Sequence, residues 1–169
     1  RDLAYAYLEK YNPSRQQLKI YLLKKYLTKF NNSKSKKDLS NTIDEVLINL
    51  EKNKLISDEL YSDSKSRMLL RRGYSINKIS QSLRQKGIKN EFIKKSIEKI
   101  KDDKIEPDFN SALKLCKKRR IGALRPGANR ELFYKKDMGI LARAGFSFEM
   151  SKRILDLEVE EFNKLIKII

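Results

Sequence analysis

The chain has 169 residues, of which 39 are Lys or Arg and 22 are Asp or Glu, which gives a formal net charge of +17. One Cys and no His exclude an internal disulfide and a thiolate metal cluster, and they remove the commonest general base. The charge favours a polyanionic partner, nucleic acid or an acidic protein surface, although a lysine-rich chain with solvated helix faces has the same composition.

The predicted fold class is all-α, because six Gly and three Pro residues supply little of the turn chemistry that an all-β chain needs. No apolar run approaches the ~18 residues of a membrane span, and no signal peptide precedes the first helix. We therefore expect a cytoplasmic protein with no membrane partner. The charge excess is even along the chain, with 12 basic and 6 acidic residues in 1–57, 13 and 7 in 58–104, and 14 and 9 in 105–169.

A leucine followed six positions later by a serine occurs three times, at Leu8 and Ser14, Leu69 and Ser75, and Leu141 and Ser147. In each case the pattern predicts a helix that ends in a short turn, after which the serine begins an amphipathic helix. Gly73 and Gly145 stand where a helix end favours a left-handed residue, and the serines stand at N-cap positions. Ser14 and Gln17 also match a capping box.

These units predict three tandem three-helix repeats, at residues 1–57, 58–104 and 105–169. A third helix in each has an apolar stripe with i, i+3, i+4, i+7 spacing. The stripe residues are Ile43, Val46, Leu47 and Leu50, then Phe92, Ile93, Ile97 and Ile100, then Val159, Phe162, Leu165 and Ile166. One such module buries little surface, so the stacked modules are expected to form an elongated, curved molecule, most simply a monomer.

Two segments interrupt this pattern. Residues 29–38 are polar and predict a mobile loop between helices. Residues 119–129 hold Gly122, Pro126 and Gly127 among arginines, and they interrupt the third repeat.

A few single residues have local interpretations. Cys116 lies in an apolar-periodic helix and is predicted to be a small buried residue, not a nucleophile. Asp58 is predicted to be an N-cap and not a catalytic acid. The tyrosines of the first repeat could stack on nucleobases, but we favour a role in helix interfaces; they are Tyr5, Tyr7, Tyr11, Tyr21 and Tyr26.

Several stretches, in order along the chain, resemble the RecX family. Residues 55–61 (LISDELY), 71–75 (RRGYS) and 83–88 (LRQKGI) are similar to its central repeat, in which an L-x-D-D-x-x-F/Y pattern leads to a Gly turn and an L-x-x-K-G-I exit. Residues 142–147 (ARAGFS) resemble its R-x-G-F-S segment, and residues 14–18 (SRQQL) its R-S-x-x-E-L segment. Ser57 stands where the family has the first of two acids. The resemblance covers essentially the whole chain.

The resemblance implies a modulator of RecA that lies in the groove of the RecA–single-stranded-DNA filament. It implies suppression of strand exchange, co-protease activity and ATP hydrolysis by RecA, with no catalysis by the modulator itself. The residues agree with a non-enzymatic role, since there is no Gly-rich phosphate loop, metal-ligand spacing or obvious carboxylate pair. We expect no cofactor and no metal. The alternative is a general helical protein that binds single- or double-stranded DNA through its basic surface.

The candidate RecA- or DNA-binding residues are basic side chains at predicted helix ends and in the densest cationic run. They are Arg71, Arg72, Arg84, Lys86, Lys117, Lys118, Arg119, Arg120 and Arg125. The first four could instead serve only to complement helix dipoles, and the run 117–125 could be a solvated loop. The arginines of that run rank above its lysines, because the planar guanidinium binds phosphate or carboxylate through two hydrogen bonds.

Overall fold

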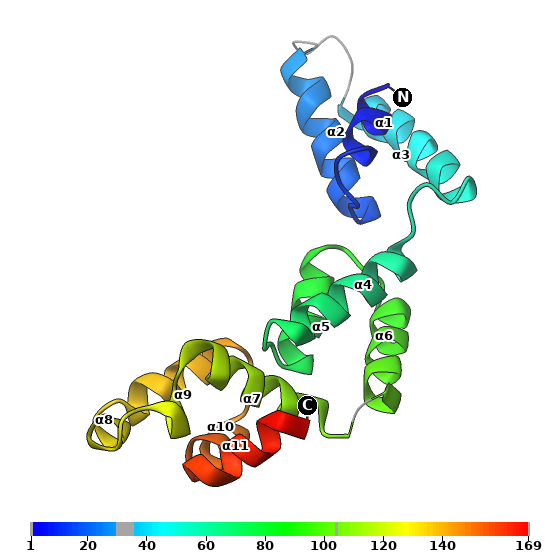
Figure 1. The fold of residues 1–169 in the computed structure, drawn as a ribbon. Helices are drawn as coiled ribbons and strands as arrows, with labels where there is room; N and C mark the ends of the chain where they lie inside the picture. The colour runs from blue at the N-terminus through cyan, green and yellow to red at the C-terminus, as the bar shows by residue number, and fades with distance from the viewer. Residues whose placement is uncertain (1, 30–35, 104, 169) are drawn as a thin grey trace. The chain divides into compact units, whose positions relative to one another are not determined.

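The computed structural model describes residues 2–29, 36–103 and 105–168, and within these ranges all regular structure is helical (Figure 1). The all-α prediction is confirmed. The helices are α1 (Asp2–Leu8), α2 (Arg15–Lys29), α3 (Lys36–Lys52), α4 (Asp58–Arg71), α5 (Ile76–Gln85), α6 (Asn90–Asp103), α7 (Pro107–Arg119), the 3₁₀ turn η1 (Gly122–Leu124), α8 (Gly127–Leu132), α9 (Tyr134–Arg143), α10 (Phe148–Leu155) and α11 (Val159–Ile168). None of the described helices combines the length and apolar character needed to cross a bilayer.

The chain divides into two compact units. Unit 1 comprises residues 1–64 with 83–93, and unit 2 comprises residues 65–82 with 94–169. The boundaries between the two units fall inside α4, α5 and α6, and not at the ends of the predicted repeats. The boundaries of the three repeats stay a prediction. Residues 105–169 hold α7 to α11 and η1, which is more than the three helices predicted there. The loop predicted at 29–38 falls mainly on residues 30–35, which lie outside the described residues.

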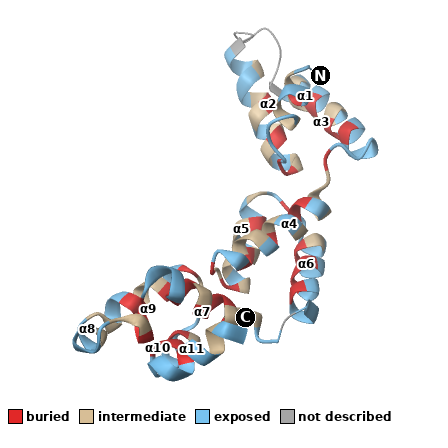
Figure 2. Ribbon diagram, viewed as in Figure 1, coloured by how far each residue is buried: buried red, intermediate tan, exposed pale blue. Residues whose placement is uncertain are grey.

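The core of unit 1 is formed where α1, α2 and α3 pack together (Figures 1 and 2). Its buried apolar residues are Ala4, Leu18, Leu22, Ile43, Leu47, Leu50 and Ile56. Tyr7, Tyr21 and Tyr26 pack against this core, and the Tyr7 and Tyr21 rings stack with centroids 4.0 Å apart. Tyr5 and Tyr11 are exposed. Three of the five tyrosines therefore have the interface role that we favoured.

The core of unit 2 lies between α7, α9, α10 and α11. Its buried apolar residues are Phe109, Ala112, Leu113, Leu115, Cys116, Ile121, Ala123, Leu141, Ala144, Phe146, Ile154, Leu155, Leu157 and Phe162. Burial raises the pKa of the Cys116 thiol to about 12, with a smaller contribution from the charge of Asp137. At neutral pH Cys116 is therefore a buried protonated thiol, as predicted, and not a reactive thiolate.

The predicted N-cap serines begin their helices as expected. The Gln17 N–H donates to Ser14 Oγ and the Ser14 N–H donates to Gln17 Oε1, so the capping box is confirmed. Ser75 Oγ accepts from the Lys78 N–H, and Ser147 Oγ accepts from the Met150 N–H. These bonds satisfy N–H groups that have no partner inside their own helix.

Two of these serines also make a second, long-range hydrogen bond. In unit 1, Ser14 Oγ donates to the Lys86 carbonyl over 2.7 Å, and in unit 2, Ser75 Oγ donates to the Gly145 carbonyl over 2.7 Å. Both acceptors belong to turns with a left-handed glycine, Gly87 at φ 76° and Gly145 at φ 94°. A Cβ at Gly145 would lie 2.5 Å from Ser75 Oγ, so the close approach requires the absence of a side chain there.

An aspartate makes a further long-range hydrogen bond next to each of these two serines, and we call each serine with its adjacent aspartate bond a joint. Asp58 Oδ1 accepts from the Arg15 N–H over 2.8 Å in unit 1, and Asp108 Oδ1 accepts from the Ile76 N–H over 2.7 Å in unit 2. The prediction that Asp58 is an N-cap was wrong. Ser57 has that role, because its Oγ accepts from the Leu60 N–H at 3.3 Å. Asp58 instead satisfies the first N–H of α2, a helix distant in the sequence.

Candidate functional site

The predicted binding residues fall into different environments. Arg71, Arg72 and Arg84 are exposed, as is the whole run from Lys117 to Arg120, whereas Lys86 is half-buried. Arg84 and Lys86 lie in unit 1, and the others lie in unit 2.

A basic hollow of 690 Å³ in unit 2 brings three of the predicted residues together. We call it the basic hollow; its lining residues are Arg72, Gly73, Tyr74, Leu115, Lys118, Arg119, Lys136, Ile140, Arg143 and Ala144. Arg71 lines a different hollow of unit 2 with Arg67, Asp103 and Lys114. Lys117 and Arg120 line neither of the two.

The ends of three helices place the cations of the basic hollow. Arg72 follows α4, where the Tyr74 N–H bonds to the Leu69 carbonyl and Gly73 takes φ 91°. The end of α7 has the same form, with Arg120 at φ 53° and the Ile121 N–H bonded to the Cys116 carbonyl. Left-handed residues of this kind end a helix abruptly and satisfy its last carbonyls.

The remaining two cations come from α9. Lys136 lies in the first turn of this helix and Arg143 is its last residue. The Lys136 ammonium lies 5.5 Å from the centroid of the Phe133 ring. Gly139 lies between these cations in the sequence, and a Cβ there would meet the Arg143 guanidinium at 3.4 Å. That distance is an ordinary van der Waals contact, so a small side chain at position 139 would also fit beside Arg143.

The basic hollow contains no compensating acid. None of its ten lining residues is Asp or Glu, and across the described part of the chain its five cations take no part in an ion pair. The C-terminal ends of α4, α7 and α9 each contribute roughly half a negative charge from the helix dipole. Five positive charges against roughly one and a half negative ones leave a strong positive potential.

Arg125 has a different role. Its guanidinium donates from Nε to Asp137 Oδ2 and from a terminal nitrogen to Asp137 Oδ1, each over 2.6 Å. The Asp137 side chain is 1% exposed, and it also accepts from the Gly122 N–H. The alternative that the run 117–125 is only a solvated loop thus fails for Arg125, whose charge holds η1 against α9. We leave Arg125 out of the basic hollow for this reason.

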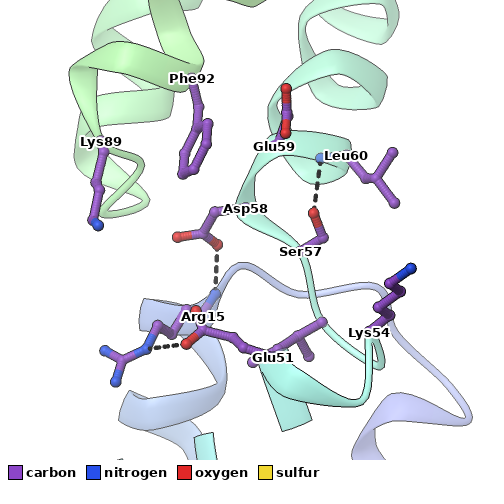
Figure 3. A pocket seen from close by; sticks show the side chains of 10 residues that line it. Arg15, Glu51, Lys54, Ser57, Asp58, Glu59, Leu60, Lys89 and Phe92 are labelled. Atoms are coloured by element: carbon purple, nitrogen blue, oxygen red, sulfur yellow. Dashed lines mark hydrogen bonds and ion pairs between the residues drawn. The ribbon is translucent and has the colours of Figure 1, made fainter. Parts of the chain in front are cut away.

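A second hollow, of 620 Å³, lies in unit 1 around Asp58 (Figure 3). We call it the Asp58 hollow; it is lined by Arg15, Glu51, Lys54, Ile56, Ser57, Asp58, Glu59, Leu60, Lys89 and Phe92. Three cations and three acids are among its lining residues. Arg15 pairs with Glu51 and with Asp44 at 3.3 Å each, and Asp58 accepts the Arg15 N–H. Most of the charge in this hollow is thus balanced within the fold.

Sequence reasoning missed Lys136 and Arg143. Both belong to α9, which is distant in sequence from the cationic run 117–120, and neither stands in a dense basic cluster. Arg143 lies in the family-like ARAGFS stretch at residues 142–147. Its position in the last turn of a helix ending at Gly145 was the one available signal, because a cation there resembles Arg72 before Gly73.

Comparison with known proteins decides the family. Residues 57–97 match the family model of RecX, second three-helix domain, a range that contains α4, α5 and the first half of α6. Over 159 residues, 92% of this chain and 83% of the relative, the chain is 33% identical to the regulatory protein RecX of Myxococcus xanthus (strain DK1622). The chain belongs to the RecX family. No solved structure matches it.

Membership of the RecX family confirms the resemblance found in the sequence. The family is one of regulatory proteins, so this protein is a RecX-type regulator and not an enzyme. The region of similarity to this relative includes residues of both units. The basic hollow of unit 2 therefore lies in a chain of the RecX family.

Proposed function

We propose that this protein binds the RecA–single-stranded-DNA filament and inhibits RecA, lowering its ATP hydrolysis, strand exchange and co-protease activity. The observation that carries the proposal is membership of the RecX family over 92% of the chain. The proposed setting is the cytoplasm, with the protein acting as a monomer.

The charge distribution supports this partner. A RecA filament presents DNA phosphates and acidic protein groups together, and the chain has a net charge of +17 spread along its length. A cationic surface raises the rate at which a polyanionic partner is encountered, and this effect weakens with salt. The basic hollow provides a local concentration of such charge in unit 2.

The test is a titration of the purified protein into RecA assembled on single-stranded DNA with ATP. The expected result is a fall in steady-state ATP hydrolysis and strand exchange that is complete at or below one protein per RecA. A DNA-dependent ATPase unrelated to RecA, assayed on the same DNA, serves as the control. If RecA keeps its full activity at stoichiometric amounts, or if both ATPases fall together, the proposal is wrong.

A general DNA-binding role is the second candidate, favoured by the acid-free lining of the basic hollow. It expects tight binding to bare DNA and equal inhibition of the two ATPases, because the protein would act only by covering DNA. Much tighter binding to RecA filaments than to the same DNA without RecA would exclude it.

A further inference from the structure

We propose that the basic hollow of unit 2 binds the phosphodiester backbone of single-stranded DNA directly, through Arg72, Lys118, Arg119, Lys136 and Arg143. This inference deepens the proposed function, which requires a filament partner but does not say whether protein or DNA is contacted. It assigns one surface of the chain to one chemical component of that filament.

The first argument is charge density. The basic hollow gathers five cations with no acid among its lining residues, and the helix ends beneath them offset only part of that charge. A DNA strand has one negative charge for each nucleotide, which in a duplex is one for about every 3.4 Å of helix axis. The surface of a folded protein normally mixes both signs, so it rarely offers so many acids to one small area. Repeated phosphates match the basic hollow better than an acidic protein face.

The second argument is the shape and chemistry of the lining. Leu115 and Ala144 are buried, and Tyr74 is half-buried. The cations Lys118, Lys136 and Arg143, by contrast, are exposed. An apolar floor with charged groups above it suits a chain that alternates apolar sugar and base surface with anionic phosphates.

The third argument is the contrast with cations that have partners inside the fold. Arg125 and Arg15 hydrogen-bond to carboxylates of the same chain, which balance their charges within the fold. The basic hollow includes three arginines, whose planar guanidinium groups bind phosphate through paired hydrogen bonds. No such internal use of their side chains exists within the described residues.

The test compares two double variants with the same change of charge. Lys118→Glu/Lys136→Glu alters two cations of the basic hollow, and Lys117→Glu/Lys135→Glu alters their exposed neighbours on the same helices, α7 and α9. Binding to a fluorescently labelled oligothymidylate without RecA is followed by anisotropy over a range of salt concentrations. Circular dichroism and thermal unfolding check both folds, and Lys118→Gln/Lys136→Gln serves as a milder variant.

The hollow variant should bind the bare oligonucleotide roughly tenfold more weakly, or worse, at low salt. Its plot of log affinity against log salt should become shallower by about 1.4, since each lost single-strand phosphate contact accounts for about 0.7. The neighbour variant should keep most of both values. The glutamine variant should shift in the same direction by a smaller factor.

Three results would overturn the inference. Equal weakening by both double variants would mean that only the net charge matters. Unchanged oligonucleotide binding by the hollow variant, with lost action on the RecA filament, would make the basic hollow a docking surface for acidic protein. Wild-type protein that does not bind the bare oligonucleotide at all would also contradict it.

The inference and the proposed function can fail separately. If the wild-type protein leaves RecA fully active but its DNA binding depends on the basic hollow, the proposed function is wrong and the phosphate site stands. If RecA is inhibited equally by wild type and hollow variant while DNA binding is unchanged, the regulator stands and the phosphate site is wrong.

Discussion

The basic hollow of unit 2 and the Asp58 hollow of unit 1 are similar in volume, at 690 and 620 Å³, but opposite in how their charges are used. The Asp58 hollow balances three cations with three acids, and Arg15 at its edge pairs with two carboxylates. The basic hollow has five cations and no acid. Both occur in a chain whose positive excess is evenly spread, so net charge by itself does not distinguish them. The location of the carboxylates does.

This comparison predicts that polar groups with partners in the fold stabilise it, and that the cations of the basic hollow do not. The largest effect is expected at Arg125. Arg125→Ala leaves the carboxylate of Asp137, which is 1% exposed, without its cation and should lower the free energy of unfolding by about 3–5 kcal/mol. Urea denaturation followed by circular dichroism measures the change. Arg119→Ala, at an exposed cation of the basic hollow, is the control and should cost less than about 0.5 kcal/mol.

The next largest loss of stability is expected at Ser75, which makes both a helix cap and a long-range hydrogen bond. Ser75→Ala removes both the cap of α5 and the hydroxyl that donates to the Gly145 carbonyl, so we expect a loss of about 2 kcal/mol. Ser147 caps α10 through the Met150 N–H from an exposed position, and Ser147→Ala should cost only about 1 kcal/mol. Chemical denaturation of the two variants side by side gives both numbers. Equal losses would mean that the long-range bond of Ser75 contributes nothing.

Two aspartates should respond to neutralisation in opposite directions. Hydrogen bonding from Lys19 holds the pKa of Asp44 below its usual value, while burial raises that of Asp108 in spite of the bond from the Ile76 N–H. The Asp44 charge therefore stabilises the fold above the unfolded pKa, and this contribution is lost as the pH falls through the folded value. The Asp108 charge instead costs stability once the pH rises through the unfolded pKa towards the folded one.

At neutral pH, Asp44→Asn should thus lower the free energy of unfolding by about 0.5–1 kcal/mol. Asp108→Asn keeps an oxygen for the Ile76 N–H and should change stability by less than about 0.5 kcal/mol, in the stabilising direction. Denaturation curves recorded at several pH values should show both differences closing at acid pH. The Asp108 difference closes as the pH falls below the unfolded pKa, and the Asp44 difference closes only as the pH falls below the lowered folded pKa. Differences of the same sign for both variants would contradict this assignment.

The smallest effect on stability is expected in the basic hollow itself. Lys136→Gln removes an exposed charge that contacts the Phe133 ring and takes part in no ion pair with the described residues, and the free energy of unfolding should change by less than about 0.5 kcal/mol. Thermal unfolding is sufficient to measure it. A large loss would show that Lys136 is held by the fold in the way Arg125 is, and the contrast between the two hollows would disappear.

The local features of this molecule follow from its sequence because they depend on residues a few positions apart. The helix-capping serines, the left-handed glycines and the buried Cys116 were all predicted, since capping and helical periodicity act over three to seven residues. The family resemblance has the same origin, in short ordered motifs. Even where a local prediction failed, as for Asp58, the correct cap was the adjacent Ser57.

The tertiary structure decided which of these local pieces meet. Nothing local to α9 indicates that Lys136 and Arg143 join Lys118 and Arg119 in one hollow, or that Asp137 takes up the guanidinium of Arg125. Helix spacing predicts which face of a helix is buried but not which helix covers it, because side-chain packing between distant segments sets that choice. The sequence by itself thus determined a basic, all-helical chain of the RecX type. Only the packing of its helices separated the arginine that holds the fold together from the exposed cations of the basic hollow.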